Sequence, residues 1–119
     1  MDTLDRYRQA VRELLEHYDR ISRQSEEQNS DRPERVENEL IFDTVRDHYQ
    51  LFHVGWIGEY RIYGSILHFD IKNGKVWIQH NGTENDVGQE LQDRGVPKTD
   101  IVIGFHSPFK RQFTEYSVG

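Results

Sequence analysis

The spacing of apolar side chains changes once along the chain, near residue 39, and this change limits the possible folds. In residues 3–21 apolar side chains recur at steps of three and four, which places them on one face of a helix. From residue 39 they alternate with polar side chains, as in β-strands. One helix followed by several strands predicts an α+β domain in which the helix packs on an antiparallel sheet. The predicted helical stripe comprises Leu4, Tyr7, Val11, Leu14, Leu15, Tyr18 and Ile21.

Between these two patterns lies a polar stretch, residues 22–38. Such a stretch has too little apolar surface to offset the entropy lost when a chain becomes ordered. We therefore predict a long surface loop at 22–38 that can be mobile.

The alternating region divides into four expected strands joined by two-residue turns. The pair Asn73-Gly74 is the strongest of these turn signals and favours a type I′ turn. The expected strands cover residues 39–45, 48–56, 60–72 and 75–80. The expected turns lie at Arg46-Asp47, Gly58-Glu59 and Asn73-Gly74.

Counting outward from these turns gives a register and therefore a set of faces. It places Tyr49 opposite both Thr44 and His68. The remaining expected pairs are Gly55 with Ile62, His53 with Gly64, and Asp70 with Trp77. Both faces are then substantially apolar. One would pack on the helix, and the other would need a cover from the C-terminal region or from another chain. The expected second face carries Leu40, Phe42, Tyr49, Leu51, Ile62, Ile66 and Trp77.

The C-terminal third adds a second helix and further sheet. Residues 83–94 predict a short helix capped by Thr83, and the apolar run 101–105 predicts a buried strand. Residues 107–119 form a tail, read either as an edge strand or as an arm. We expect a single domain over residues 1–119, with four to six strands.

Composition excludes several classes of protein. The chain has 15 basic and 21 acidic side chains, a net charge of −6, which disfavours direct binding to nucleic acid. The absence of cysteine excludes a disulfide framework, a thiolate zinc site and a cysteine nucleophile. The first residues are polar and acidic, unlike a signal peptide, so we predict a cytoplasmic protein and no membrane association.

Three polar side chains are candidates for a catalytic or metal-binding site. His53, His68 and Asp70 share a face in the counted register, where they could orient an imidazole or bind a metal. One hypothesis is therefore a metal-dependent or hydrolytic enzyme. The favoured interpretation is that these histidines only satisfy hydrogen bonds. We accordingly predict no catalytic residue, no metal ligand and no cofactor.

Two other motifs contain residues that can carry chemistry. Arg46-Asp47-His48 looks like a triad in sequence, but its first two members are expected in a turn. Lys110-Arg111 lies beside Phe109 and Phe113, a combination that could stack on a nucleic acid strand. A DNA-binding accessory factor is therefore a further alternative, although one basic doublet in an acidic chain gives it little support.

Several motifs at fixed spacing resemble the signature of the XisI family, the fdxN-element excision controlling factors. They begin with Ile41-Phe42-Asp43-Thr44, Arg46-Asp47-His48-Tyr49-Gln50-Leu51 and His53-Val54-Gly55-Trp56. They continue with Arg61-Ile62-Tyr63-Gly64, Trp77-Ile78-Gln79, Gly95-Val96-Pro97-Lys98 and Gly104-Phe105-His106. The resemblance covers essentially the whole chain.

The resemblance implies a role as well as a fold. Proteins of this family are cyanobacterial and are linked to programmed DNA rearrangement in heterocyst differentiation. They usually occur with a companion, XisH, which resembles nuclease-fold proteins, while a separate recombinase cuts and joins DNA. The resemblance carries no set of catalytic residues over to this sequence. The implied function is thus a non-enzymatic regulatory protein that binds an XisH-like companion.

An unpaired apolar face also predicts association with another chain. We expect a homodimer or a complex with the companion, made through the second sheet face and the aromatic tail. The candidate interaction residues are Tyr49, Leu51, Ile62, Ile66, Trp77, Phe109, Phe113 and Tyr116.

Overall fold

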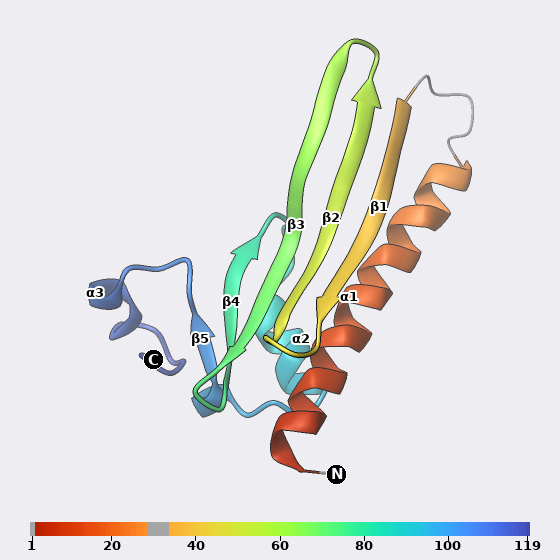
Figure 1. The fold of residues 1–119 in the computed structure, drawn as a ribbon. Helices are drawn as coiled ribbons and strands as arrows, with labels where there is room; N and C mark the ends of the chain where they lie inside the picture. The colour runs from red at the N-terminus through yellow and green to blue at the C-terminus, as the bar shows by residue number, and fades with distance from the viewer. Residues whose placement is uncertain (1, 29–33) are drawn as a thin grey trace.

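The computed structural model describes residues 2–28 and 34–119, and its first element is a long helix, α1 (Thr3–Gln28) (Figure 1). The Asp2 carboxylate accepts a hydrogen bond from the Asp5 amide at 2.8 Å and so caps the first turn. The predicted apolar stripe is confirmed from Tyr7 to Tyr18, whose side chains are buried, whereas Ile21 remains 48% exposed. No helix in these two described ranges has the length and apolar character that crossing a membrane requires.

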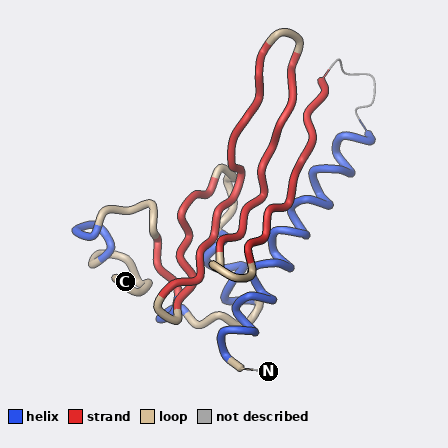
Figure 2. Tube along the Cα trace, viewed as in Figure 1, coloured by secondary structure: helices blue, strands red, loops and turns tan. Residues whose placement is uncertain are grey.

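Five strands form one sheet in the order in which they occur along the chain (Figure 2). The first four are antiparallel neighbours, and β5 pairs in parallel with β4. The predicted α+β class, with a largely antiparallel sheet, is confirmed. The strands are β1 (Glu34–Asp43), β2 (His48–Ile57), β3 (Tyr60–Lys72), β4 (Lys75–Asn81) and β5 (Ile101–Ile103).

The connection from β4 to β5 contains α2 (Val87–Asp93) and a 3-10 turn, η1 (Lys98–Asp100). The second helix is shorter than predicted because Asp86, rather than Thr83, caps it: its side chain accepts the Gln89 amide at 3.0 Å. Thr83 instead donates its hydroxyl to the side-chain oxygen of Asn81 at 2.7 Å. The predicted strand at 101–105 ends at Ile103.

Both longer helices pack on the same face of the sheet. The core between them contains side chains of α1, of α2 and of every strand, including Leu14, Phe69 and Leu91, each fully buried. We call this the helix-covered face and the opposite one the open face. The tail beyond β5 forms α3 (Pro108–Arg111) and a bridge from Ser117 to Val102, so it is not a regular edge strand.

A β-bulge changes the faces that the sequence predicts. The expected pairs Gly55–Ile62 and His53–Gly64 are confirmed, but the register shifts between Leu51 and Phe52, where β3 carries one extra residue. Tyr49 therefore pairs with Phe69 on one side and with Phe42 on the other, not with His68 and Thr44. Because one extra residue reverses the side-chain direction, Tyr49 lies on the helix-covered face.

Two turns of the sheet can be compared directly with the sequence prediction. Asn73 and Gly74 have φ values of 55° and 76°, which confirms the predicted type I′ turn, and Asp70 pairs with Trp77 as expected. The turn between β1 and β2 is longer than predicted, since Asp43 is the partner of His48.

The predicted loop at 22–38 is wrong over most of its length. Residues 22–28 continue α1 and residues 34–38 belong to β1, while 29–33 lie outside the described residues. Arg23 bonds to Asp19 one turn earlier at 3.0 Å, a type of contact that stabilises a polar helical surface. β1 pairs with β2 along its full length through backbone groups, and these need no apolar side chains.

Candidate functional site

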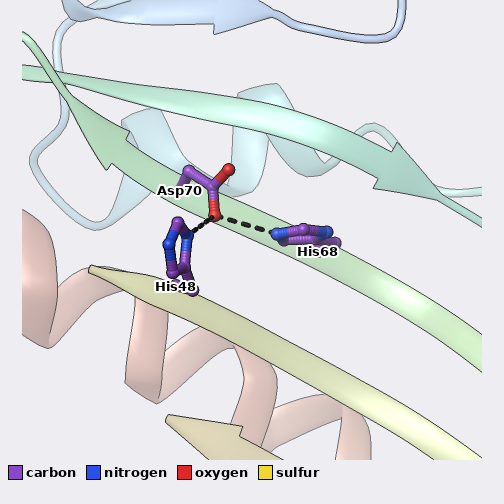
Figure 3. Close-up of side chains that lie close together, drawn as sticks. All are labelled: His48, His68 and Asp70. Carbon is purple, nitrogen blue, oxygen red and sulfur yellow. Dashed lines mark hydrogen bonds and ion pairs between the residues drawn. The ribbon is translucent and has the colours of Figure 1, made fainter. Parts of the chain in front are cut away.

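Two histidines and one aspartate converge on the open face, at the end of the sheet nearest the β3–β4 turn. His48 is the first residue of β2, and His68 and Asp70 lie two residues apart on β3. The Asp70 Oδ1 atom lies 2.7 Å from His48 Nδ1 and 2.8 Å from His68 Nε2 (Figure 3). Gln79 donates a hydrogen bond to the other carboxylate oxygen at 3.1 Å. The carboxylate therefore joins three side chains from three strands.

The surroundings keep Asp70 ionised. Its side chain is only 14% exposed, and this burial by itself raises the pKa. The hydrogen bonds with His48, His68 and Gln79 outweigh burial and leave the pKa of Asp70 below its ordinary value. His48 is 53% exposed and His68 28% exposed at the side chain, so solvent reaches the histidine side of the cluster.

The sequence predicts two of these three residues correctly. His68 and Asp70 share a face, but His53 does not join them, because the bulge places it on the helix-covered face opposite Gly64. His48 takes its place. In the sequence His48 stands out only as part of the apparent triad, whose members are in fact separated: Asp47 bonds to Arg8, and Arg46 to Asp43.

The predicted interaction face does not exist as one surface. Tyr49 and Leu51 are 0% and 1% exposed beneath α1, so they cannot meet a partner in this fold. Trp77 lies on the open face but is 8% exposed. The ammonium of Lys72 and the guanidinium of Arg111 cover its ring, 4.6 and 5.0 Å from the centroid.

The remaining members of that predicted face fall into two groups. Ile62, Ile66 and Tyr116 are half-buried, and Ile66 and Tyr116 pack against the core. Phe109 and Phe113 are 70% and 74% exposed and stack edge to face on each other. Arg111, of the basic doublet, donates to the carbonyl of His106 at 3.0 Å.

A second exposed apolar group lies at the tip of the β2–β3 hairpin, which extends beyond β1 and α1 (Figure 1). Arg61 lies over both Trp56 and Tyr63, at 5.3 and 5.8 Å. The sequence signal was present, since aromatic residues flank a Gly58-Glu59 turn where polar residues are usual. We call this group the hairpin-tip cluster: Trp56 (45% exposed), Ile57 (43%), Tyr60 (79%) and Tyr63 (70%).

Comparisons with known proteins agree with this architecture. The family model described as XisI protein matches residues 1–118. A crystal structure of a XisI-like protein from Anabaena variabilis ATCC 29413 is 42% identical, with a TM-score of 0.82. A second, of the fdxN element excision controlling factor XisI from the same organism, is 36% identical, with a TM-score of 0.79. Each covers 99% of this chain and 100% of the other. Comparison with curated proteins gave no match. The match over nearly the whole chain, together with the shared fold, means that this protein belongs to the XisI family.

Proposed function

We propose that this protein is a non-enzymatic accessory factor in the control of DNA-element excision, and that it acts by binding a companion protein. Family membership supports the first part, because one relative is described as an excision controlling factor. The hairpin-tip cluster is the observation that carries the second part.

The composition of the hairpin-tip cluster suits a protein partner. Trp, Tyr and Arg are the side chains that most often dominate the energy of protein interfaces. Here Trp56, Tyr63 and Arg61 lie together at the end of a projecting hairpin, so a partner can reach them without displacing the helices. An XisH-like protein is the companion that the family implies.

The net charge of −6 supports a protein partner rather than DNA. Binding to a duplex comes mainly from basic side chains that neutralise phosphates. In this chain acidic side chains outnumber basic ones, 21 to 15. Arg111 is also committed to Trp77 and to backbone carbonyls, which weakens the alternative of a DNA-binding tail.

The non-enzymatic part of the proposal rests on the contacts among His48, His68 and Asp70. An activated nucleophile lies within hydrogen-bond reach of its base. In the described part of the chain, neither His48 nor His68 is bonded to a hydroxyl or an amine; both contact Asp70. The enzyme hypothesis also requires His53, which lies on the opposite face of the sheet from His68 and Asp70.

We also propose that two copies of the chain associate. The face containing Tyr49 and Leu51, which the sequence predicts to be uncovered, does not support this association because α1 covers both. The exposed hairpin-tip cluster and the Phe109–Phe113 pair support association, and two-fold dimers are its commonest form. Sedimentation at tens of micromolar should show a dimer; a monomer under these conditions would contradict this part alone.

Copurification tests the main proposal. The chain is expressed together with the XisH-like companion from the same source, and the affinity of the pair is measured by calorimetry. The double variant Trp56→Ser/Tyr63→Ser should lower the affinity at least about tenfold, as loss of interface anchors does. Val45→Ser is the matched control, because Val45 is 85% exposed and lies in the β1–β2 turn, away from the tip.

Two results would overturn the proposal. One is a companion that binds neither the parent chain nor any variant. The other is retention of a DNA duplex by the isolated chain at physiological salt, with an affinity that falls steeply as salt is added, which would favour the DNA-binding alternative.

A further inference from the structure

We propose that His48, His68 and Asp70 form a binding site for a divalent transition-metal ion of the zinc class. This inference does not depend on companion binding. It concerns only the geometry of the three side chains, and a binding measurement on the isolated chain tests it.

The three ligand atoms already converge. One nitrogen of each histidine and one Asp70 oxygen lie within 4.8 Å of one another. Ligand atoms in a tetrahedral zinc site are about 3.4 Å apart, given metal–ligand bonds of about 2.1 Å. The two observed contacts, 2.7 and 2.8 Å, are those of hydrogen bonds. Room for an ion requires each of these contacts to lengthen by about 0.6 Å, and the two histidine nitrogens, which lie no more than 4.8 Å apart, to reach a similar separation.

The backbone fixes the positions of all three residues. His68 and Asp70 are separated by one residue on β3, so both point to the open face. His48 is the direct partner of Asp70 across the β2–β3 pairing. No mobile loop has to order before an ion binds, because each ligand comes from a paired strand. Such pre-organisation favours binding.

The surroundings of Asp70 resemble the outer contacts of known metal sites. Ligating carboxylates are themselves hydrogen-bonded, which fixes their orientation. Gln79 makes this contact to Oδ2 and leaves Oδ1 directed at the histidines. Among the described residues, no lysine or arginine forms an ion pair with Asp70, so no fixed cation competes for the carboxylate.

The set of donor atoms selects the class of metal. Two imidazole nitrogens and one carboxylate oxygen suit Zn²⁺ and its neighbours, whereas Mg²⁺ and Ca²⁺ prefer oxygen ligands. The exposed side of His48 leaves a fourth position for water. A bound ion would join the first residue of β2 to the middle of the sheet, beside the Trp77 that the tail covers.

Calorimetry of the untagged chain, stripped of metal with a chelator, tests the site directly. We expect one Zn²⁺ per chain, a melting temperature raised by several degrees, and no binding of Mg²⁺. Asp70→Asn and His68→Ala should each weaken zinc binding by more than about 100-fold, and Gln79→Ala by about tenfold.

Matched variants make the result decisive. His53→Gln removes a histidine from the same strand as His48 but from the other face, and should leave zinc affinity unchanged. If Asp70→Asn lowers stability too far, His48→Gln replaces it, because His48 is 53% exposed. The proposal is wrong if zinc binds these ligand variants as tightly as the parent chain, or if His53→Gln weakens binding equally.

Discussion

The guanidinium of Arg8 donates two hydrogen bonds to the carboxylate of Asp47, at 2.9 and 3.2 Å, and so fastens α1 to the turn between β1 and β2. The Tyr49 hydroxyl donates a third at 2.8 Å. Asp47 has a φ of 59°, a left-handed conformation that Asp and Asn adopt more readily than other residues except glycine. One residue therefore serves both the turn and the packing of the helix.

Replacing Asp47 should separate these two roles. Asp47→Asn keeps the left-handed conformation but loses the charge, and we expect a loss of about 1 kcal/mol in the free energy of unfolding. Asp47→Ala should cost about 1–2 kcal/mol more, because alanine is strained at this φ. Urea denaturation measures both. Glu59→Gln, at an exposed turn, is the control. Equal losses for the Asn and Ala variants would contradict the role of the turn.

The same ion pair predicts a dependence on acid pH. The hydrogen bond from Arg8 lowers the pKa of Asp47 below its ordinary 3.8 and outweighs the opposing effect of burial. Because the folded pKa lies below the unfolded one, the stabilisation is complete above the unfolded pKa and is lost as pH falls through the folded one. The difference in free energy of unfolding between the parent and Asp47→Asn should therefore shrink as pH is lowered from neutrality to below 3.8. A difference independent of pH would exclude this linkage.

Three tyrosines should ionise late on titration with alkali. Burial, followed by hydrogen bonds to Asp100, Glu90 and Asp47 respectively, raises the pKa values of Tyr7, Tyr18 and Tyr49 from 10.0 to about 12. Because the folded pKa is the higher one, the stabilisation holds below 10.0 and is lost as pH rises through about 12.

Near-ultraviolet absorbance follows this titration. Tyr49→Phe should remove one tyrosine from the late phase, and the chain in denaturant should show a single phase near 10.0. A folded protein in which every tyrosine ionises in that single phase would show that these hydroxyls are not held as described.

The helix α2 and the C-terminal tail meet at Gly88 and Tyr116. A Cβ atom at Gly88 would lie 2.5 Å from the Tyr116 hydroxyl, too close for the ring to keep its place. Gly88→Ala should therefore destabilise the protein by about 1–3 kcal/mol. With Tyr116→Ala present, the same change should be neutral or stabilising by up to about 1 kcal/mol, since alanine favours helix. A thermodynamic cycle over the four proteins measures this coupling, and simple additivity would refute it.

How far the sequence predicts the fold depends on whether a feature is local. The stripe of α1 and the Asn73-Gly74 turn depend on neighbouring residues, and both are confirmed. The polar half of β1 could not be predicted, because backbone pairing with β2 holds it and polar side chains give no signal.

The candidate site follows the same rule. His68 and Asp70 share a face because they lie two apart on one strand, a relationship that survives any shift between strands. Whether His48 or His53 joins them depends on the register of β2 against β3. The bulge sets that register. A single extra residue in a strand changes the composition and the alternation too little to be recognised in the sequence.

Because β3 carries this extra residue, the number of residues in the strand matters as much as their identity. Deleting Ile66 would remove the register shift, and every later residue of β3 would then point to the opposite face of the sheet. Leu67 and Phe69 would turn toward water, and Asp70 would turn under α1. We therefore expect a deletion inside β3 to cost more stability than one in a turn or in the tail, unless a second change restores the count.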